Sequence, residues 1–170
     1  MVIAVAILSE RTHRRAPFIM VTSSLAVIGY IILLSDHSPG ASYVGIFFAA
    51  AGIYPSAAIV LSWPANNVSG QTKRAIANAM QISIGNLGAV MGTQLYRTEW
   101  SPRYYVGHSM ALAYLVANVA VVGTLWLVLS KENEKKAAIR EAEGIAPLEE
   151  AGIPQDGYQG DEDPRWIFQT

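Results

Sequence analysis

The chain has 170 residues, of which 52% are hydrophobic and 15% are charged, and its net charge is −1. A near-neutral charge gives no support for nucleic-acid binding, and the absence of cysteine excludes disulfides, thiolate metal sites and cysteine nucleophiles. The three histidines are scattered without the spacing of metal ligands, so we expect neither a metal nor another cofactor.

The first predicted element is a short apolar segment over residues 1–8, which is followed by Arg11, Arg14 and Arg15. Eight residues are too few to span a bilayer. A signal peptide carries its positive charge before its apolar part, whereas here the charge comes after it. We therefore interpret residues 1–8 as the end of a helix that begins upstream in a longer protein. A short interfacial N-terminus is the alternative.

Four long stretches without Asp, Glu, Lys or Arg come next, at residues 17–34, 43–63, 75–96 and 108–129. About 20 predominantly apolar residues are needed to cross the hydrocarbon core of a bilayer, and a single crossing segment must be helical to satisfy its own backbone. The sequence therefore predicts an all-α membrane protein in a lipid bilayer, with four full transmembrane helices and an N-terminal helix stub. A soluble all-helical protein is the alternative, but soluble helices normally carry a charged face.

A proline interrupts the second of these stretches. Pro55 has no amide hydrogen, and its ring clashes with the preceding turn, so we expect a kink there. The backbone carbonyl that the proline frees needs a donor from a neighbouring helix or from water.

The third stretch is the most polar. Its amides and glycines recur every three or four residues and so share one helix face: Asn78, Gln81, Gly85, Gly88 and Gly92. Gly88 and Gly92 form a GxxxG pair, which lets two helix backbones approach closely. Asn86 lies near the edge of the same face. We predict Asn78, Gln81 and Asn86 as substrate-pathway candidates, and Gly85, Gly88, Gly92 and Pro55 as helix-packing residues. Amides that only bond to adjacent helices are the alternative.

Loop charges predict the orientation. Residues 9–16 carry three Lys or Arg, residues 64–74 carry two and residues 131–143 carry four, whereas residues 35–42 carry none and residues 97–107 carry two. The positive-inside rule places the first three segments in the cytoplasm, and with them the C-terminus.

A motif in the loop after the second stretch points to a family. Asn66, Asn67, Gly70, Lys73 and Arg74 form it, preceded by Trp63. Gly85-Asn86, Gly88, Pro102-Arg103-Tyr104, Gly107-His108 and the acidic-then-aromatic segment 160–166 continue the pattern. With these residues the chain resembles the C-terminal half of fungal allantoate-permease-like transporters, which are anion:cation symporters of the major facilitator superfamily. The resemblance implies that residues 1–130 are helices nine to twelve with the end of helix eight. Residues 131–170 would be a cytosolic tail, helical at first and flexible over 144–163.

The resemblance also implies a function. It implies secondary active uptake, by alternating access, of a small organic anion or vitamin such as allantoate, nicotinate or pantothenate. It further implies a location in the plasma membrane and makes protons a candidate coupling ion. Because such a substrate site lies between two halves, binding is expected only together with the missing N-terminal helices. A small helical membrane protein with a structural or assembly role is the alternative. No catalytic motif is found, so an enzyme is not expected.

Overall fold

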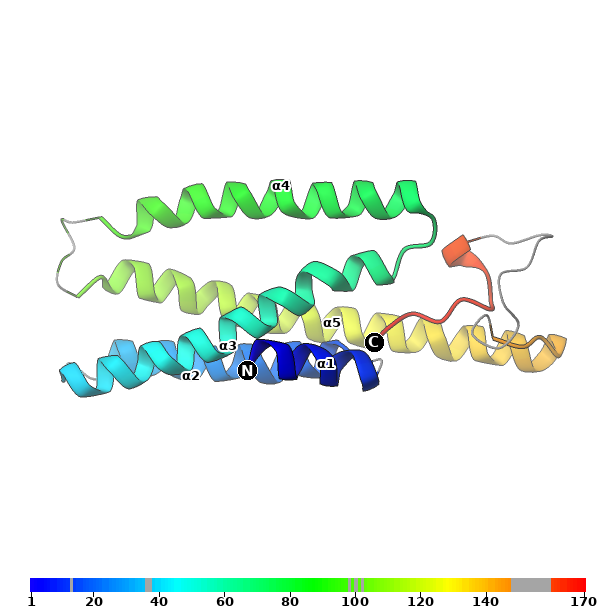
Figure 1. Ribbon diagram of the computed structural model, residues 1–170, viewed down its shortest axis with the longest axis horizontal. Helices are drawn as coiled ribbons and strands as arrows, with labels where there is room; N and C mark the ends of the chain where they lie inside the picture. The colour runs from blue at the N-terminus through cyan, green and yellow to red at the C-terminus, as the bar shows by residue number, and fades with distance from the viewer. Residues whose placement is uncertain (13, 36–37, 98, 100, 102, 148–159) are drawn as a thin grey trace.

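The computed structural model describes residues 1–12, 14–35, 38–97, 99, 101, 103–147 and 160–170. These residues form five α-helices and a short 3-10 helix, which are α1 (Val2–Thr12), α2 (Ala16–Ser35), α3 (Pro39–Asn66), α4 (Gln71–Leu95), α5 (Tyr105–Glu143) and η2 (Gly160–Glu162) (Figure 1). The predicted all-α class is confirmed. Pro102 of the sequence motif, and residues 148–159 of the segment predicted to be flexible, lie outside the described residues.

Three of the helices are both long enough and apolar enough to cross a membrane, namely α2, α3 and α5. The sequence predicted α4 as a fourth span. With 25 residues it is about 37 Å long, which is enough to cross a hydrocarbon core of about 30 Å. Its amides and glycines lower its hydropathy, so α4 has the length of a span without the apolar composition of the other three.

The helices run back and forth, so that successive connections alternate between the two ends of the bundle (Figure 1). We call the end where α3 leads into α4, and where residues 160–170 lie, the tail end. At the opposite end α2 gives way to α3 and α4 gives way to α5. α5 has 39 residues, about 58 Å, and extends beyond the bundle at the tail end (Figure 1). This extension includes residues 131–143, which the sequence predicted to be helical.

The closest helix packing is between α2 and α3, where glycines lie at the contact. A Cβ atom added to Gly52 would lie 2.4 Å from the carbonyl oxygen of Thr22, and one added to Gly29 would lie 2.4 Å from the amide nitrogen of Ala49. No larger residue fits at such distances. α3 remains helical through the buried Pro55. It lies along α2 in its first half and then diverges toward the start of α4 (Figure 1).

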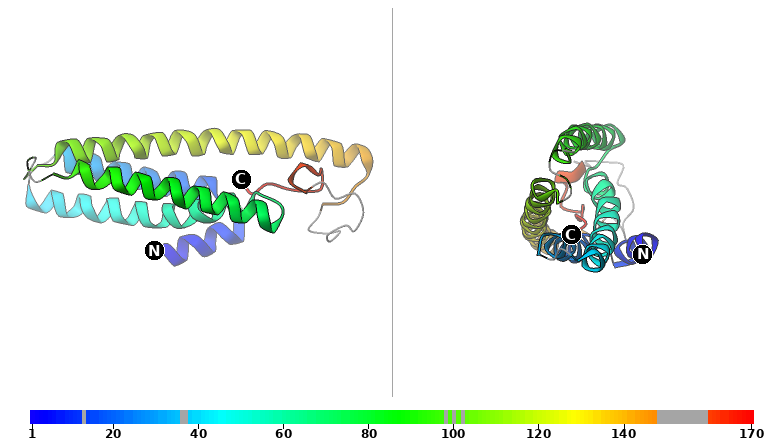
Figure 2. Two further views of the ribbon diagram at one scale, coloured as in Figure 1. Left: turned by 90° about the horizontal axis from the view of Figure 1, so that it is seen from above. Right: turned by 90° about the vertical axis from the view of Figure 1, so that its left-hand side faces the viewer.

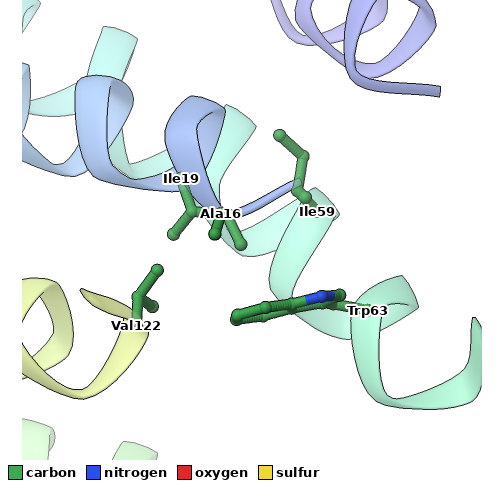
Figure 3. Close-up of a cluster of buried hydrophobic side chains, with 5 residues drawn as sticks. All are labelled: Ala16, Ile19, Ile59, Trp63 and Val122. Carbon is green, nitrogen blue, oxygen red and sulfur yellow. The ribbon is translucent and has the colours of Figure 1, made fainter. Parts of the chain in front are cut away.

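A small apolar core joins α2, α3 and α5 near the tail end. Figure 3 shows its members, which are Ala16, Ile19, Ile59, Trp63 and Val122. A buried polar group connects the same helices. Ser23 on α2 lies 2.9 Å from the hydroxyl of Ser56 on α3 and accepts a hydrogen bond of 3.1 Å from the side-chain amide of Asn118 on α5. Interhelical bonds of this kind fix helices against each other where no water competes.

Candidate functional site in the helix bundle

Gln81 is half-buried on α4 and faces α3. Its side-chain nitrogen donates a 2.8 Å hydrogen bond to the backbone carbonyl of Val60. Inside an α-helix this carbonyl would accept the amide hydrogen of residue 64, but Pro64 has none. Gln81 therefore replaces the bond that Pro64 removes and ties α4 to α3. This bond agrees with the alternative in which an amide of this helix only bonds to an adjacent helix. A role of Gln81 in a substrate pathway stays a prediction.

Gln81→Leu should destabilise the fold by about 1 kcal/mol, because the Val60 carbonyl loses its donor. Pro64→Ala restores an amide hydrogen at residue 64, so the cost of Gln81→Leu should fall close to zero in that background. Thermal unfolding in detergent is measured for the original chain, the two single variants and the double variant. The four stabilities give the coupling free energy between residues 64 and 81 directly. Gln94→Leu, at an exposed amide of α4, is the control. An equal cost in both backgrounds would contradict the proposed exchange of donors.

Two acceptors on the inner side of α4 remain unpaired. The side-chain oxygens of Asn78 and Gln81 are shielded from solvent and have no hydrogen-bond partner among the described residues. The two residues lie about one turn apart, as their spacing predicted. Buried acceptors are normally paired, so these two oxygens keep the capacity to accept further hydrogen bonds. Asn86 is exposed, so the structure does not bring it together with the other two amides.

The sequence predicted that the glycines of α4 pack closely against another helix, but within the described chain they do not. A Cβ added to Gly85, Gly88 or Gly92 would meet no described atom within 4 Å. No residue of α4 is buried. The GxxxG contact is therefore not made with the described parts of the chain, and it stays a prediction for helices outside it. The close glycine packing is found between α2 and α3 instead, because those helices are the ones that lie against each other.

Gly88 and Gly92 line a cavity of about 500 Å³ between α2, α4 and α5. Its walls are mostly apolar and include the aromatic side chains of Tyr30, Tyr96 and Tyr114. The Tyr96 hydroxyl lies 3.4 Å from Nδ1 of His108.

The loop motif at the tail end holds the end of the chain. The indole nitrogen of Trp63 donates to the backbone oxygen of Gln169 at 2.8 Å, and Asn66 donates to its side-chain oxygen at 3.1 Å. Asn67 bonds to the backbone of Gln169 as well. Lys73 pairs with Asp161 at 2.9 Å, and its hydrogen bond keeps the pKa of Asp161 below its usual value. The motif residues are thereby bound to a segment about 90 to 100 positions away in sequence.

The two other motif residues shape the loop. Gly70 has a φ of 89°, a left-handed conformation that favours glycine, and it precedes the first turn of α4. The amide of Arg74 bonds to the carbonyl of Gly70 at 3.1 Å. The short connection from α3 to α4 therefore turns at Gly70.

Arg15 is an organising residue that was not predicted from the sequence. Its side chain is largely buried, bonds to Ser62 and donates a 2.8 Å hydrogen bond to the side-chain oxygen of Gln169. Burial lowers the pKa of the guanidinium, while nearby Glu10 acts in the opposite direction. The sequence treated Arg15 only as a loop charge. It also passed over Ser23, Ser56 and Asn118, although a polar residue inside an apolar span is a signal by itself.

Comparison with known proteins finds fungal transporters. An MFS-type transporter of Penicillium expansum is 32% identical over 173 residues, which cover 98% of this chain and 33% of that protein. The high-affinity nicotinic acid transporter of Saccharomyces cerevisiae is 30% identical over 165 residues, covering 96% of this chain and 30% of its own length. The chain is homologous to part of the fungal major facilitator transporters.

These relatives are much longer than the chain, which spans about a third of their length. No family model matches the chain, and no solved structure matches it either. The relatives are transporters and not enzymes, which confirms the non-enzymatic assignment. The all-helical structure of the described residues, with three candidate membrane spans, is consistent with one part of such a transporter.

Proposed function

We propose that the chain is helices nine to twelve of a secondary active transporter that takes up a small organic anion or vitamin by alternating access. The similarity to the nicotinic acid transporter over 96% of the chain carries this proposal and favours nicotinate among the candidates. A thiamine pathway transporter of Saccharomyces cerevisiae, 27% identical over 146 residues, also falls within a vitamin class. Allantoate and pantothenate rest on the resemblance of the loop motif, and protons are the proposed coupling ion.

The inner face of α4 is the part of the pathway that this chain would supply. The two unpaired amide oxygens of Asn78 and Gln81 lie on it, and α4 has no buried residue. In major facilitator transporters the substrate sits between two halves near the middle of the bilayer. The two acceptors are shielded from solvent, whereas most of α4 is exposed, and the N-terminal helices of a complete transporter would cover that exposed surface.

A chimera tests the proposal. Residues 1–170 replace the aligned segment of the yeast nicotinic acid transporter, and uptake of labelled nicotinate is measured in cells that lack their own nicotinate carrier. Saturable uptake well above the vector control is expected, and the double change Asn78→Leu with Gln81→Leu should reduce it at least tenfold. A chimera that reaches the cell surface and transports no nicotinate would contradict nicotinate as the substrate. Allantoate and pantothenate, assayed in the same cells, separate a different substrate from no transport.

We propose further that the tail end is cytoplasmic and that the protein lies in the plasma membrane. Single cysteines at Gly40 and Gln71 of this cysteine-free chain report the orientation. Gly40 is suitable because it is exposed and a side chain there meets nothing within 4 Å, whereas the neighbouring Ser38 hydroxyl caps α3. A membrane-impermeant thiol reagent on intact cells should label residue 40 and not residue 71. The reverse labelling would overturn the orientation.

A further inference from the structure

Two asparagines at the tail end clamp the backbone of the chain's last residues. Asn133 on α5 donates to the carbonyl of Phe168 and accepts from its amide, both at 2.9 Å. Asn67, at the end of α3, donates to the carbonyl of Gln169 at 3.1 Å and accepts from its amide at 2.7 Å. Each side-chain amide thus forms the same pair of bonds that a neighbouring β-strand would form with one residue of an extended chain.

The clamp acts from two sides. Successive residues of an extended backbone point their amide and carbonyl groups to opposite sides, so Phe168 is held from α5 and Gln169 from α3. Side-chain contacts add selectivity for this segment. The Phe168 ring lies 4.3 Å from the ammonium nitrogen of Lys136, and the Gln169 side-chain oxygen accepts from both Arg15 and Asn66. In Figure 2, seen along the bundle, the segment lies among α2, α3, α4 and α5.

The same segment reaches α4. Asp161 receives a hydrogen bond from Lys73 of α4 on its carboxylate and one of 2.6 Å from Lys136 of α5 on its backbone carbonyl. Arg140 of α5 donates to the carbonyl of Pro164 at 2.8 Å. One residue, Asp161, therefore bridges two helices. Since Lys73 is mostly exposed, its ion pair with Asp161 is weak and easily broken.

We propose that residues 160–170 are a detachable strap that fixes the start of α4 relative to α5. α4 has no buried residue, and the bonds that hold it to the rest of the described chain include the Gln81 bond to α3 and the Lys73 bond to the strap. The clamp holds the strap against α3 and α5, and the ion pair of Asp161 with Lys73 connects the strap to α4. Release of the strap leaves the start of α4 free to move while α2 and α3 stay packed.

Hydrogen exchange tests this on the full 170-residue chain in lipid nanodiscs. Asn67→Leu combined with Asn133→Leu removes the clamp, and deletion of residues 164–170 removes the strap's anchored part. Both should raise the exchange of amides in residues 71–80 at least fivefold and leave the α2 amides around Ser23 unchanged. Gln94→Leu, the same kind of change at an exposed amide, should alter neither. Unchanged exchange at the start of α4, or an equal increase in α2, would overturn the proposal.

A disulfide gives a second measurement. A Cβ at residue 160 would lie 3.6 Å from the Cβ of Ser69, which is within the range for a disulfide. Ser69→Cys with Gly160→Cys should cross-link rapidly under mild oxidation, counted by loss of both free thiols. Ser69→Cys with Gly144→Cys is the matched control, because Gly144 has a similar positive φ and nothing within 4 Å of an added Cβ.

The disulfide also distinguishes loss of the strap contact from misfolding of the clamp-deficient variant. In the clamp-deficient background the 69–160 cross-link should form several-fold more slowly, and once formed it should return α4 exchange to the original rate. Cross-linking at an unchanged rate, or a failure of the disulfide to restore protection, would show that the asparagines do not act through the strap. Neither measurement involves transport, so its outcome is independent of the proposed function.

Discussion

Gly52→Ala is expected to disrupt the packing of α2 against α3. The added methyl group would lie 2.4 Å from the carbonyl oxygen of Thr22 and 2.5 Å from the amide nitrogen of Ala26, both backbone atoms that cannot rotate away. The two helices must then separate along the contact that holds the apolar core and the Ser23–Ser56 bond. Overpacking of this kind typically costs about 1–3 kcal/mol, and we expect the upper end of that range here, measured as a fall in thermal stability in detergent.

Gly88→Ala is the matched control, since a Cβ there meets nothing within 4 Å. Both changes also remove a glycine from a helix interior, which by itself favours the helix. Gly88→Ala should therefore leave the unfolding temperature unchanged or slightly raised. Equal losses for the two variants would show that the α2–α3 contact is not the tight one. In a chimera with a complete transporter, Gly88→Leu is expected to harm folding or uptake more than Val90→Leu, because the GxxxG face would there meet another helix.

Residues 1–170 expressed alone should give no uptake of nicotinate, allantoate or pantothenate above background. The chain spans about a third of the length of its transporter relatives, and a midplane site needs both halves. Its pathway candidates Asn78 and Gln81 lie on a helix with no buried residue, so within the described chain nothing closes the far side of a pathway. The loss relative to the chimera should be complete within the sensitivity of the assay.

Co-expression supplies the positive counterpart. The preceding part of the nicotinic acid transporter, provided as a separate polypeptide, should restore a fraction of the uptake, because helix faces with small residues can associate in lipid. Saturable uptake by the 170-residue chain alone would refute the two-half requirement. The pathway would then have to be built from several copies of this chain.

The sequence by itself determined the class and the helices. Uncharged stretches near 20 residues long allow only helices in lipid, and the structure has a helix over each of them. The turn at Gly70 was also predictable from local chemistry, since a left-handed residue favours glycine. The polar face of α4 was predicted from spacing alone, because the period of a helix is fixed. However, α4 is less apolar than α2, α3 and α5, so it is a weaker candidate for a membrane span than was predicted from its lack of charge.

Only the tertiary structure decided which partners these faces meet. Glycines occur in α2, α3 and α4, but close packing falls on Gly29 of α2 and Gly52 of α3, because packing depends on which helices are adjacent. The bond from Gln81 to Val60 joins an amide to a carbonyl freed by Pro64, and pattern analysis of either helix alone does not connect them. The strap shows the same limit most clearly. Asn67 and Asn133 bind residues 102 and 35 positions away, and backbone hydrogen bonding carries almost no sequence signature by which such a partner can be recognised.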